Sequence, residues 1–201
     1  MTLLTESQQD SLTEIINIAF SRAAASLSDL TQHRVLLNVP KVSIHPMNEL
    51  QGILSEFVQD EIATVHQIFD GSLSGDAMLM LDYEGAVKLS RLLTEGNPNK
   101  KQLYESDREV LNEVGNILLN ACLGTFGNML EVQITFSVPR LNLADLETLL
   151  DSLLIGKDEI QYTLVIYTRF NIEEREISGY LLIVMGVTSL ERLLGSLEKL
   201  G

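Results

Sequence analysis

The chain has 201 residues, of which 45% are hydrophobic and 21% charged, and its formal net charge at pH 7 is -14. This composition fits a globular protein with a sizeable core, built as one large domain or as two closely packed halves. The acidic balance argues against a nucleic-acid partner, which needs clustered Lys and Arg, and no apolar run approaches the ~20 residues that span a bilayer.

In the first half of the chain, the hydrophobic pattern predicts three strands and three helices. The first helix is the longest, and its apolar side chains recur at three- and four-residue steps, which is typical of a helix with one buried face. Turn residues separate the strands, and the stretch EGNPNK is the clearest linker. The expected elements are a helix over 5–30, a strand over 34–45, a helix near 47–58, strands over 61–69 and 75–83, a helix over 85–94 and a linker over 95–101.

The second half repeats this order of elements. We expect a helix over 106–130 with Val110, Val114, Ile117 and Ala121 on its core side, and an alternating strand after it in which Val132, Ile134, Phe136 and Val138 share one face. A helix over 143–154, strands over 159–170 and 178–187 and a helix over 190–200 follow, with a charged exposed turn over 171–176.

Because the two halves match, the expected fold is a single α/β domain made of two repeats, 1–99 and 100–201. A pseudo-twofold axis relates the repeats. Hairpins and helices join the strands, so the six expected strands form a largely antiparallel sheet that is flanked by the two long helices.

Each half also carries one copy of a sparse pattern of polar residues. The pattern has an acid, a second acid four residues later, an asparagine three residues after that, and a proline after a gap of 22. With ordinary residue usage, its Glu, Asn and Pro coincide at about one position in ten thousand. The copies lie 99 residues apart: Asp10, Glu14, Asn17 and Pro40 form the first, and Glu109, Glu113, Asn116 and Pro139 form the second.

The spacing within the pattern points to a helical face that meets a partner. Residues at i, i+4 and i+7 share one side of a helix. Asparagine costs roughly 0.5 kcal/mol relative to alanine inside a helix, so two matched asparagines call for an explanation. A carboxamide offers a donor and an acceptor without titrating near pH 7, and can orient a water molecule. A carboxylate one turn earlier can hold a partner's lysine or arginine.

This doubled pattern resembles that of the CheC, CheX and FliY family of bacterial and archaeal chemotaxis phosphatases. Two copies in about 200 residues resemble the CheC branch most closely. The resemblance implies hydrolysis of the aspartyl phosphate on a CheY-type response regulator. The protein would need no cofactor of its own, because the regulator's active site supplies Mg²⁺, and the glutamine deamidase CheD is a second candidate partner.

By the same resemblance, each residue of the pattern has an expected role. Asn17 and Asn116 would align water for in-line attack on phosphorus, and Glu14 and Glu113 would bind a lysine of the regulator. The pattern's first position holds Asp10 in one copy and Glu109 in the other, where the family pattern has Asp or Ser. Two further sets have no chemical role: Pro40 and Pro139 shape the strand beside each helix, while Ser21 and Asn120 extend the polar stripes as solvated rim.

Other readings of the sequence remain open. The acid and amide pairs could be a solvated polar face, or the chain could be a binding module that docks on a response regulator or on CheD without hydrolysis. A structural part of the flagellar switch is disfavoured, because we find no added assembly domain after Gly201. The three histidines are scattered, so we expect no metal site. Cys122 has apolar neighbours, so we expect its thiol to be buried. The start lacks a signal segment and Cys122 is the single cysteine, so we expect a cytoplasmic protein.

Overall fold

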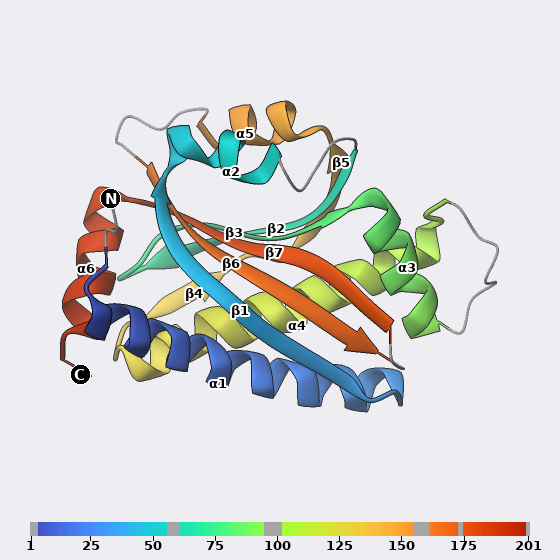
Figure 1. Cartoon of the computed structure of the whole chain (residues 1–201), viewed down its shortest axis with the longest axis horizontal. Coiled ribbons are helices and arrows are strands. Elements are labelled where there is room, and N and C mark those ends of the chain that lie inside the picture. Colours follow the sequence, from blue (N-terminus) through green and yellow to red (C-terminus); the bar gives the residue numbers. More distant parts are fainter. Residues whose placement is uncertain (1–3, 56–60, 95–101, 155–160, 173–174, 200–201) are drawn as a thin grey trace.

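Two long helices lie against one antiparallel sheet in this computed structural model, which describes residues 4–55, 61–94, 102–154, 161–172 and 175–199 (Figure 1). Side chains at positions 39, 40 and 154 are also outside the description. The elements of the first half are α1 (Glu6–Thr31), β1 (Val35–Pro46), the 3-10 helix η1 (Met47–Glu49), α2 (Leu50–Ser55), β2 (Ile62–Gly71), β3 (Gly75–Asp82) and α3 (Tyr83–Thr94).

The second half follows the same order, with one strand divided in two. Its elements are α4 (Glu105–Met129), β4 (Ile134–Phe136), β5 (Arg140–Ala144), α5 (Leu146–Leu154), β6 (Gln161–Ile172), β7 (Arg175–Gly186) and α6 (Val187–Leu197). The expected linker over 95–101 lies outside the described residues. So do residues 56–58 of the helix expected near 47–58 and residues 159–160 of the strand expected over 159–170.

The sheet interleaves the two halves. Its strand order is β1-β6-β7-β3-β2-β4, with β5 also paired to β2, and every pairing is antiparallel. The first strand of each half therefore lies at an edge, beside the second strand of the other half. Within each half only the second and third strands pair with each other, and the first strand pairs only with the other half. The α/β class and the antiparallel sheet are confirmed.

The sheet has seven strands where six were expected. The expected strand over 132–138 is confined to β4, and a further strand, β5, runs into the start of the helix expected over 143–154. Residues Ser137–Pro139 separate β4 from β5, and proline has no backbone N–H to donate to a ladder. The matched strand β1 is continuous, but its register with β6 shifts between Asn38 and Lys41. Pro40 lies within that shift, and its side chain is outside the described residues.

Each long helix buries a face against the sheet and against the other helix. Thr5 caps α1 in a capping box with Gln8. The apolar side chains that recur at three- and four-residue steps along this helix are buried, namely Leu12, Ile16, Ala19, Ala23 and Leu27. On α4 the expected core face lies at one side of a wider buried surface. Of the expected residues Val114 is fully buried, while Val110, Ile117 and Ala121 are half-buried against the core. The fully buried apolar side chains are Leu111, Val114, Leu118, Leu119, Cys122, Leu123 and Phe126. The reason is that α4 contacts α1, α3, β2 and β3 at once, so its buried arc is wider than one stripe.

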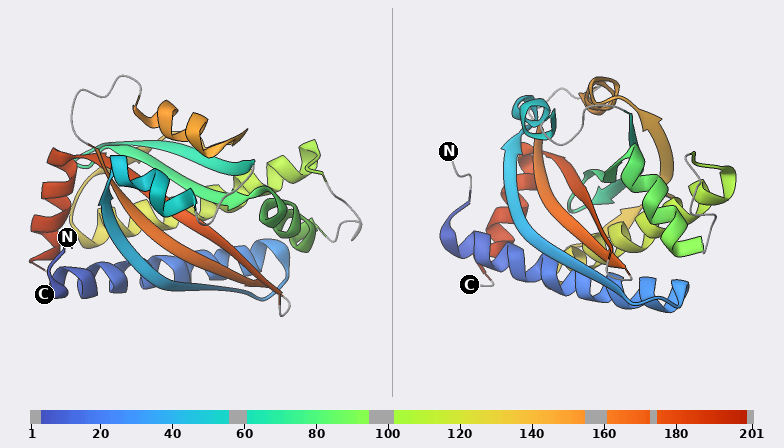
Figure 2. Two further views of the ribbon diagram at one scale, coloured as in Figure 1. Left: turned by 45° about the horizontal axis from the view of Figure 1, so that its top comes forward. Right: turned by 45° about the vertical axis from the view of Figure 1, so that its right-hand side comes forward.

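Helices cover both faces of the sheet and enclose two hydrophobic cores. The larger core lies between the sheet and α1, α3, α4 and α6, and the smaller one lies beneath α2 and α5 on the opposite face (Figures 1 and 2). Cys122 belongs to the larger core, where burial raises the pKa of its thiol. None of the described helices is long and apolar enough to cross a membrane.

The charged turn expected over 171–176 is shorter than predicted. Asn171 pairs with Glu176 and Ile172 pairs with Arg175 in the β6–β7 ladder, so four of its six residues belong to strands. Residues 173–174 lie outside the described part. Cross-strand pairing overrides local polarity here, since the ladder satisfies the backbone groups on both strands.

Candidate functional site

The second copy of the pattern lies in one surface pocket. Glu109, Glu113 and Asn116 project from one side of α4, and Pro139 faces them from the segment between β4 and β5. The pocket has a volume of about 530 Å³. After the gap of 22 residues, the chain therefore returns to lie beside α4, the helix that carries Asn116. The lining residues are Gln67, Glu109, Asn112, Glu113, Asn116, Asn120, Phe136, Ser137, Val138 and Pro139.

One wall of the pocket is apolar and exposed. The alternation in the sequence places Phe136 and Val138 on one strand face, but Phe136 is 41% and Val138 82% exposed. Ile68 on β2, 56% exposed, is hydrogen-bonded through its N–H to Ser137 Oγ at 3.0 Å. Exposed apolar side chains gathered beside polar groups are typical of a surface that meets another protein.

The acidic side of the pocket has charge that is free to meet a cation. Neither Glu109 nor Glu113 forms an ion pair with a described residue, and both are exposed on α4. A lysine or arginine that entered the pocket would find two carboxylates one helical turn apart, and the resulting hydrogen bonds would be charge-assisted.

A row of three amides runs along the floor of the pocket. Gln67 Nε2 donates to Asn120 Oδ1 at 3.0 Å, and Asn120 Nδ2 donates to Asn116 Oδ1 at 2.7 Å. Gln67 Nε2 also donates to the backbone carbonyl of Ser137 at 2.7 Å. The interpretation of Asn120 as solvated rim is therefore wrong, because its side chain is half-buried and joins the asparagine of the pattern to the sheet.

Two oxygen atoms of the lining lack a hydrogen-bond partner among the residues that the structure describes. They are Gln67 Oε1 and Asn112 Oδ1, and both are buried. Asn112 forms a second Glu-x-x-Asn pair with Glu109, which the sequence excludes from the pattern because Thr135 stands at the proline position. The structure nevertheless places Asn112 in the pocket. Buried acceptors without partners cost free energy and are suited to receive a donor from a bound group.

A glycine lets α4 approach the sheet at this site. A Cβ added at Gly115 would overlap the side chain of Val65 on β2, the strand that also carries Gln67. The close approach brings Gln67 within reach of Asn120.

We expect Gly115→Ala to lower the free energy of unfolding by about 1–3 kcal/mol, because the added methyl group overpacks this contact. Val65→Ala removes the obstructing methyl groups. In urea unfolding, the double variant should therefore lose less stability than the sum of the two single variants. Additive losses would show that α4 does not depend on this contact.

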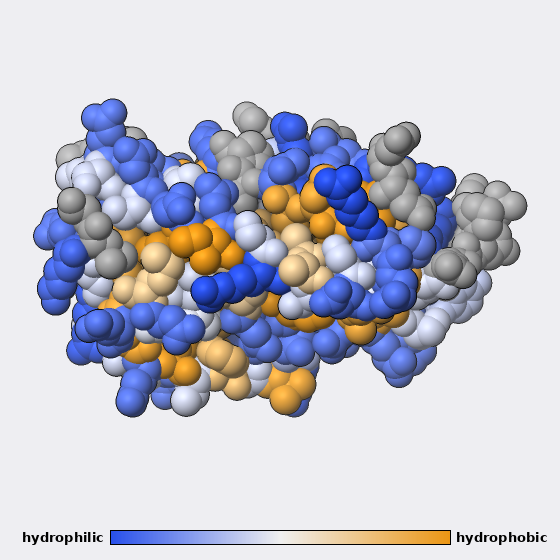
Figure 3. Space-filling model, turned by 90° about the horizontal axis from the view of Figure 1, so that it is seen from below, coloured by the Kyte–Doolittle hydropathy of each residue, from blue (hydrophilic) through white to orange (hydrophobic). Residues whose placement is uncertain are grey.

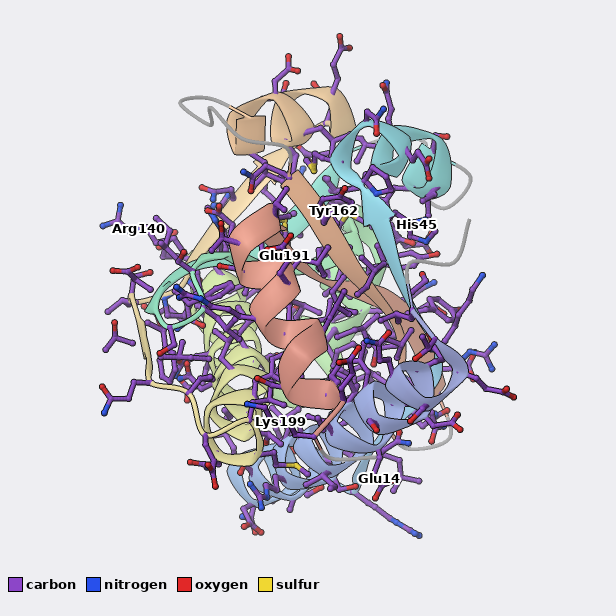
Figure 4. The ribbon with its side chains drawn as sticks, turned by 90° about the vertical axis from the view of Figure 1, so that its left-hand side faces the viewer. Glu14, His45, Arg140, Tyr162, Glu191 and Lys199 are labelled. Atoms are coloured by element: carbon purple, nitrogen blue, oxygen red, sulfur yellow. The ribbon has the colours of Figure 1, made fainter. Side chains whose placement is uncertain are left out.

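The first copy of the pattern is placed differently. Asp10, Glu14 and Asn17 lie on the outer side of α1 and are exposed, and Asn17 has no side-chain hydrogen bond to a described residue. Figure 4 shows Glu14 pointing away from the fold, far from Arg140, which follows Pro139 of the second copy. Seen from the α1 side, the surface is largely hydrophilic, with hydrophobic patches between the polar side chains (Figure 3). Ser21 Oγ donates to the Asn17 backbone carbonyl at 2.8 Å.

Sequence reasoning missed Gln67, which lies 49 residues before Asn116. A signal for it exists, since Gln67 is a polar residue in the apolar strand sequence IATVHQIF and is 1% exposed. Polar side chains are rarely buried without a hydrogen-bonding purpose. The pocket walls formed by Phe136 and Val138 have no such signal, because alternation does not tell which strand face is covered.

Comparison with known proteins shows similarity to two chemotaxis proteins of Bacillus subtilis. The chain is 26% identical over 144 residues to the CheY-P phosphatase CheC, a match that covers 70% of this chain and 68% of CheC. It is 23% identical over 144 residues to the flagellar motor switch phosphatase FliY, covering 71% of this chain and 37% of FliY. The chain thus matches little more than a third of FliY. No protein-family model matches the chain.

Solved structures share the whole fold. The structure of Thermotoga maritima FliY superposes with a TM-score of 0.78 at 20% identity, covering 98% of this chain and 99% of that one. The FliM middle domain from H. pylori superposes with a TM-score of 0.64 at 12% identity, covering 96% of this chain and 99% of that one.

The chain has the α/β fold of FliY and of the FliM middle domain, and its two long helices carry the acid–amide pairs. The similarity to CheC and FliY in sequence, with the FliY fold across the chain, supports the CheC, CheX and FliY family.

Proposed function

We propose that the protein is a phosphatase for the aspartyl phosphate of a CheY-type receiver domain. The observation that carries this proposal is the pocket on α4, where Glu113 and Asn116 lie together under an exposed apolar wall. The relatives CheC and FliY support the proposal, because both are named as phosphatases. The same face on α1, with Glu14 and Asn17, is a second candidate site that fits the proposed duplication into repeats 1–99 and 100–201.

In the proposed reaction the protein supplies position rather than a covalent intermediate. Glu113 binds a lysine of the receiver and sets the docking register, and Asn116 orients a water molecule against the phosphorus atom. The water oxygen bonds to phosphorus as the bond from phosphorus to the aspartyl oxygen breaks. The products are the aspartate carboxylate and dihydrogen phosphate, which takes up both water protons. Mg²⁺ belongs to the substrate, since the receiver carries it and it neutralises charge on the phosphoryl oxygens.

The acidic surface of the protein does not prevent this encounter. Receiver phosphorylation adds negative charge, and the chain itself carries a formal charge of -14. At physiological ionic strength, salt screens charges beyond roughly 8 Å, so short-range contacts with the receiver's lysine decide the orientation. We place this reaction in the cytoplasm, and we retain CheD as a second candidate partner.

The alternative is a binding module that acts by occupancy, and the shared fold with FliM favours it as the second candidate. The two differ in stoichiometry. We expect one molecule of this protein to clear about 50 molecules of radiolabelled phospho-receiver faster than their spontaneous decay, since a catalyst is regenerated after each turnover. An effect that stops at one receiver per protein molecule would favour the binding module and remove the phosphatase proposal.

A further inference from the structure

The amide row has a fixed direction, which the sheet determines. The Ser137 carbonyl can only accept, so the Gln67 group that faces it at 2.7 Å must be the NH₂ group. That NH₂ group also donates to Asn120, so the Asn120 oxygen faces Gln67 and its NH₂ group faces Asn116. The carboxamide of Asn116 is then held with its oxygen toward Asn120.

This orientation leaves Asn116 with unused hydrogen-bonding capacity. Its Oδ1 accepts one hydrogen bond and retains a second lone pair, and its Nδ2 donates to no described residue. A free asparagine turns over a broad range about its last side-chain torsion. The bond from Asn120 removes this freedom before a partner arrives, which is the preorganisation that water positioning requires.

The first half of the chain lacks this row, although its strands follow the same arrangement. One matched couple of strand pairs is Asn142 with Thr64 and Ser43 with Val165. Ser43 lies 99 residues before Asn142, and Val165 lies 101 residues after Thr64. A second matched couple is Phe136 with Phe69 and Leu37 with Phe170, and it shows the same two intervals of 99 and 101 residues. By these intervals, Thr168 stands in the position of Gln67.

Thr168 repeats one of the two contacts that Gln67 makes. Its Oγ1 donates at 3.5 Å to the carbonyl of Asn38, the residue 99 positions before Ser137. It forms no hydrogen bond with Ser21, which stands in the position of Asn120 and bonds instead to the Asn17 backbone. The packing differs as well, because Ile16 occupies the position of Gly115. No residue in the described part of the chain therefore fixes the carboxamide of Asn17 in the way that Asn116 is fixed.

We propose that Gln67 and Asn120 are positioning residues that hold Asn116, and that they make the α4 site the dominant one. The inference rests on the proposed phosphatase function and adds to it. The first site keeps an asparagine at the matched place but must order it in every encounter, which lowers its rate rather than its affinity for the receiver.

The test exchanges the row for its counterpart in the first half. Asn120→Ser lies on a half-buried helix face and is expected to fold, and Gln67→Thr is a second variant at the other end of the row. Each should lower kcat about 3- to 10-fold with KM unchanged, because the docking carboxylates are untouched. In the Asn116→Ala background, Asn120→Ser should have no further effect, since the residue through which it acts is gone.

Side-chain NMR of Asn116 separates failure of this inference from failure of the phosphatase proposal. In the wild type, its NH₂ resonances should report an ordered side chain, and Asn120→Ser should make them mobile on the ps–ns timescale. Normal turnover in Asn120→Ser, or an equal loss of kcat in both backgrounds, would overturn the positioning role. A wild type that is inactive, with Asn116 ordered by Asn120 all the same, would refute only the phosphatase proposal. An Asn116 side chain that is equally mobile in both proteins would refute the row itself.

Discussion

Asn116→Ala is expected to lower kcat for receiver dephosphorylation about tenfold or more, which corresponds to roughly 1.4 kcal/mol of barrier. The physical reason is that the alanine side chain can neither donate to nor accept from the attacking water. Glu113 remains in place, so KM should change little. The measurement is the steady-state loss of radiolabel from a phosphorylated receiver at several receiver concentrations.

Two comparisons sharpen this expectation. Asn17→Ala should reduce kcat by less than about twofold, because the α1 face lacks the bonds that orient its asparagine. Asn128→Ala is the matched control, since Asn128 is an exposed asparagine near the end of the same helix and does not line the pocket. It should behave as wild type. A larger loss from Asn17→Ala than from Asn116→Ala would reverse the ranking of the two sites.

Glu113→Lys is expected to raise KM at least about tenfold while changing kcat little. A hydrogen bond to a charged group contributes about 1.5–3 kcal/mol, and each 1.4 kcal/mol corresponds to a factor of ten in affinity. Reversing the charge replaces this attraction by repulsion from the receiver's lysine. Binding to a receiver activated with beryllofluoride, followed by calorimetry, measures the effect without turnover.

The control for charge is Glu105→Lys. Glu105 is exposed in the first turn of α4 and lies outside the pocket lining, and the substitution changes net charge by the same amount. If both variants weakened binding equally, the effect would be a long-range one of net charge, and Glu113 would have no docking role. We expect only Glu113→Lys to lose affinity, because salt screens the more remote site.

The sequence predicted the order of the elements well, since periodicity depends on burial of one face and that burial is what the fold provides. It failed where tertiary contacts decide. The second-half counterpart of β1 is interrupted over Ser137–Pro139 and runs on to Ala144, past the strand expected over 132–138. The buried face of α4 is wider than one stripe because several elements pack on it. Local polarity at Asn171 and Glu176 suggested a turn, but pairing across the hairpin extends the strands.

For the candidate site, the spacing placed Glu109, Glu113 and Asn116 on one helical face, and in the structure these three residues line one pocket together with Pro139. The spacing of the pattern could not predict the residues at the floor of that pocket. Gln67 approaches α4 only because β2 pairs with a strand of the other half and Gly115 admits the contact. No local pattern encodes such an approach, since it depends on how the two halves interleave.

The most direct test of the account is a single-turnover measurement with the protein in excess over phosphorylated receiver. With all receiver bound, the wild type should release phosphate at least about tenfold faster than the receiver does alone. The double variant Asn17→Ala and Asn116→Ala should bind the receiver with wild-type affinity and release phosphate at the spontaneous rate. Fast release by a bound double variant would contradict the account, because the two asparagines would then contribute nothing to the chemistry.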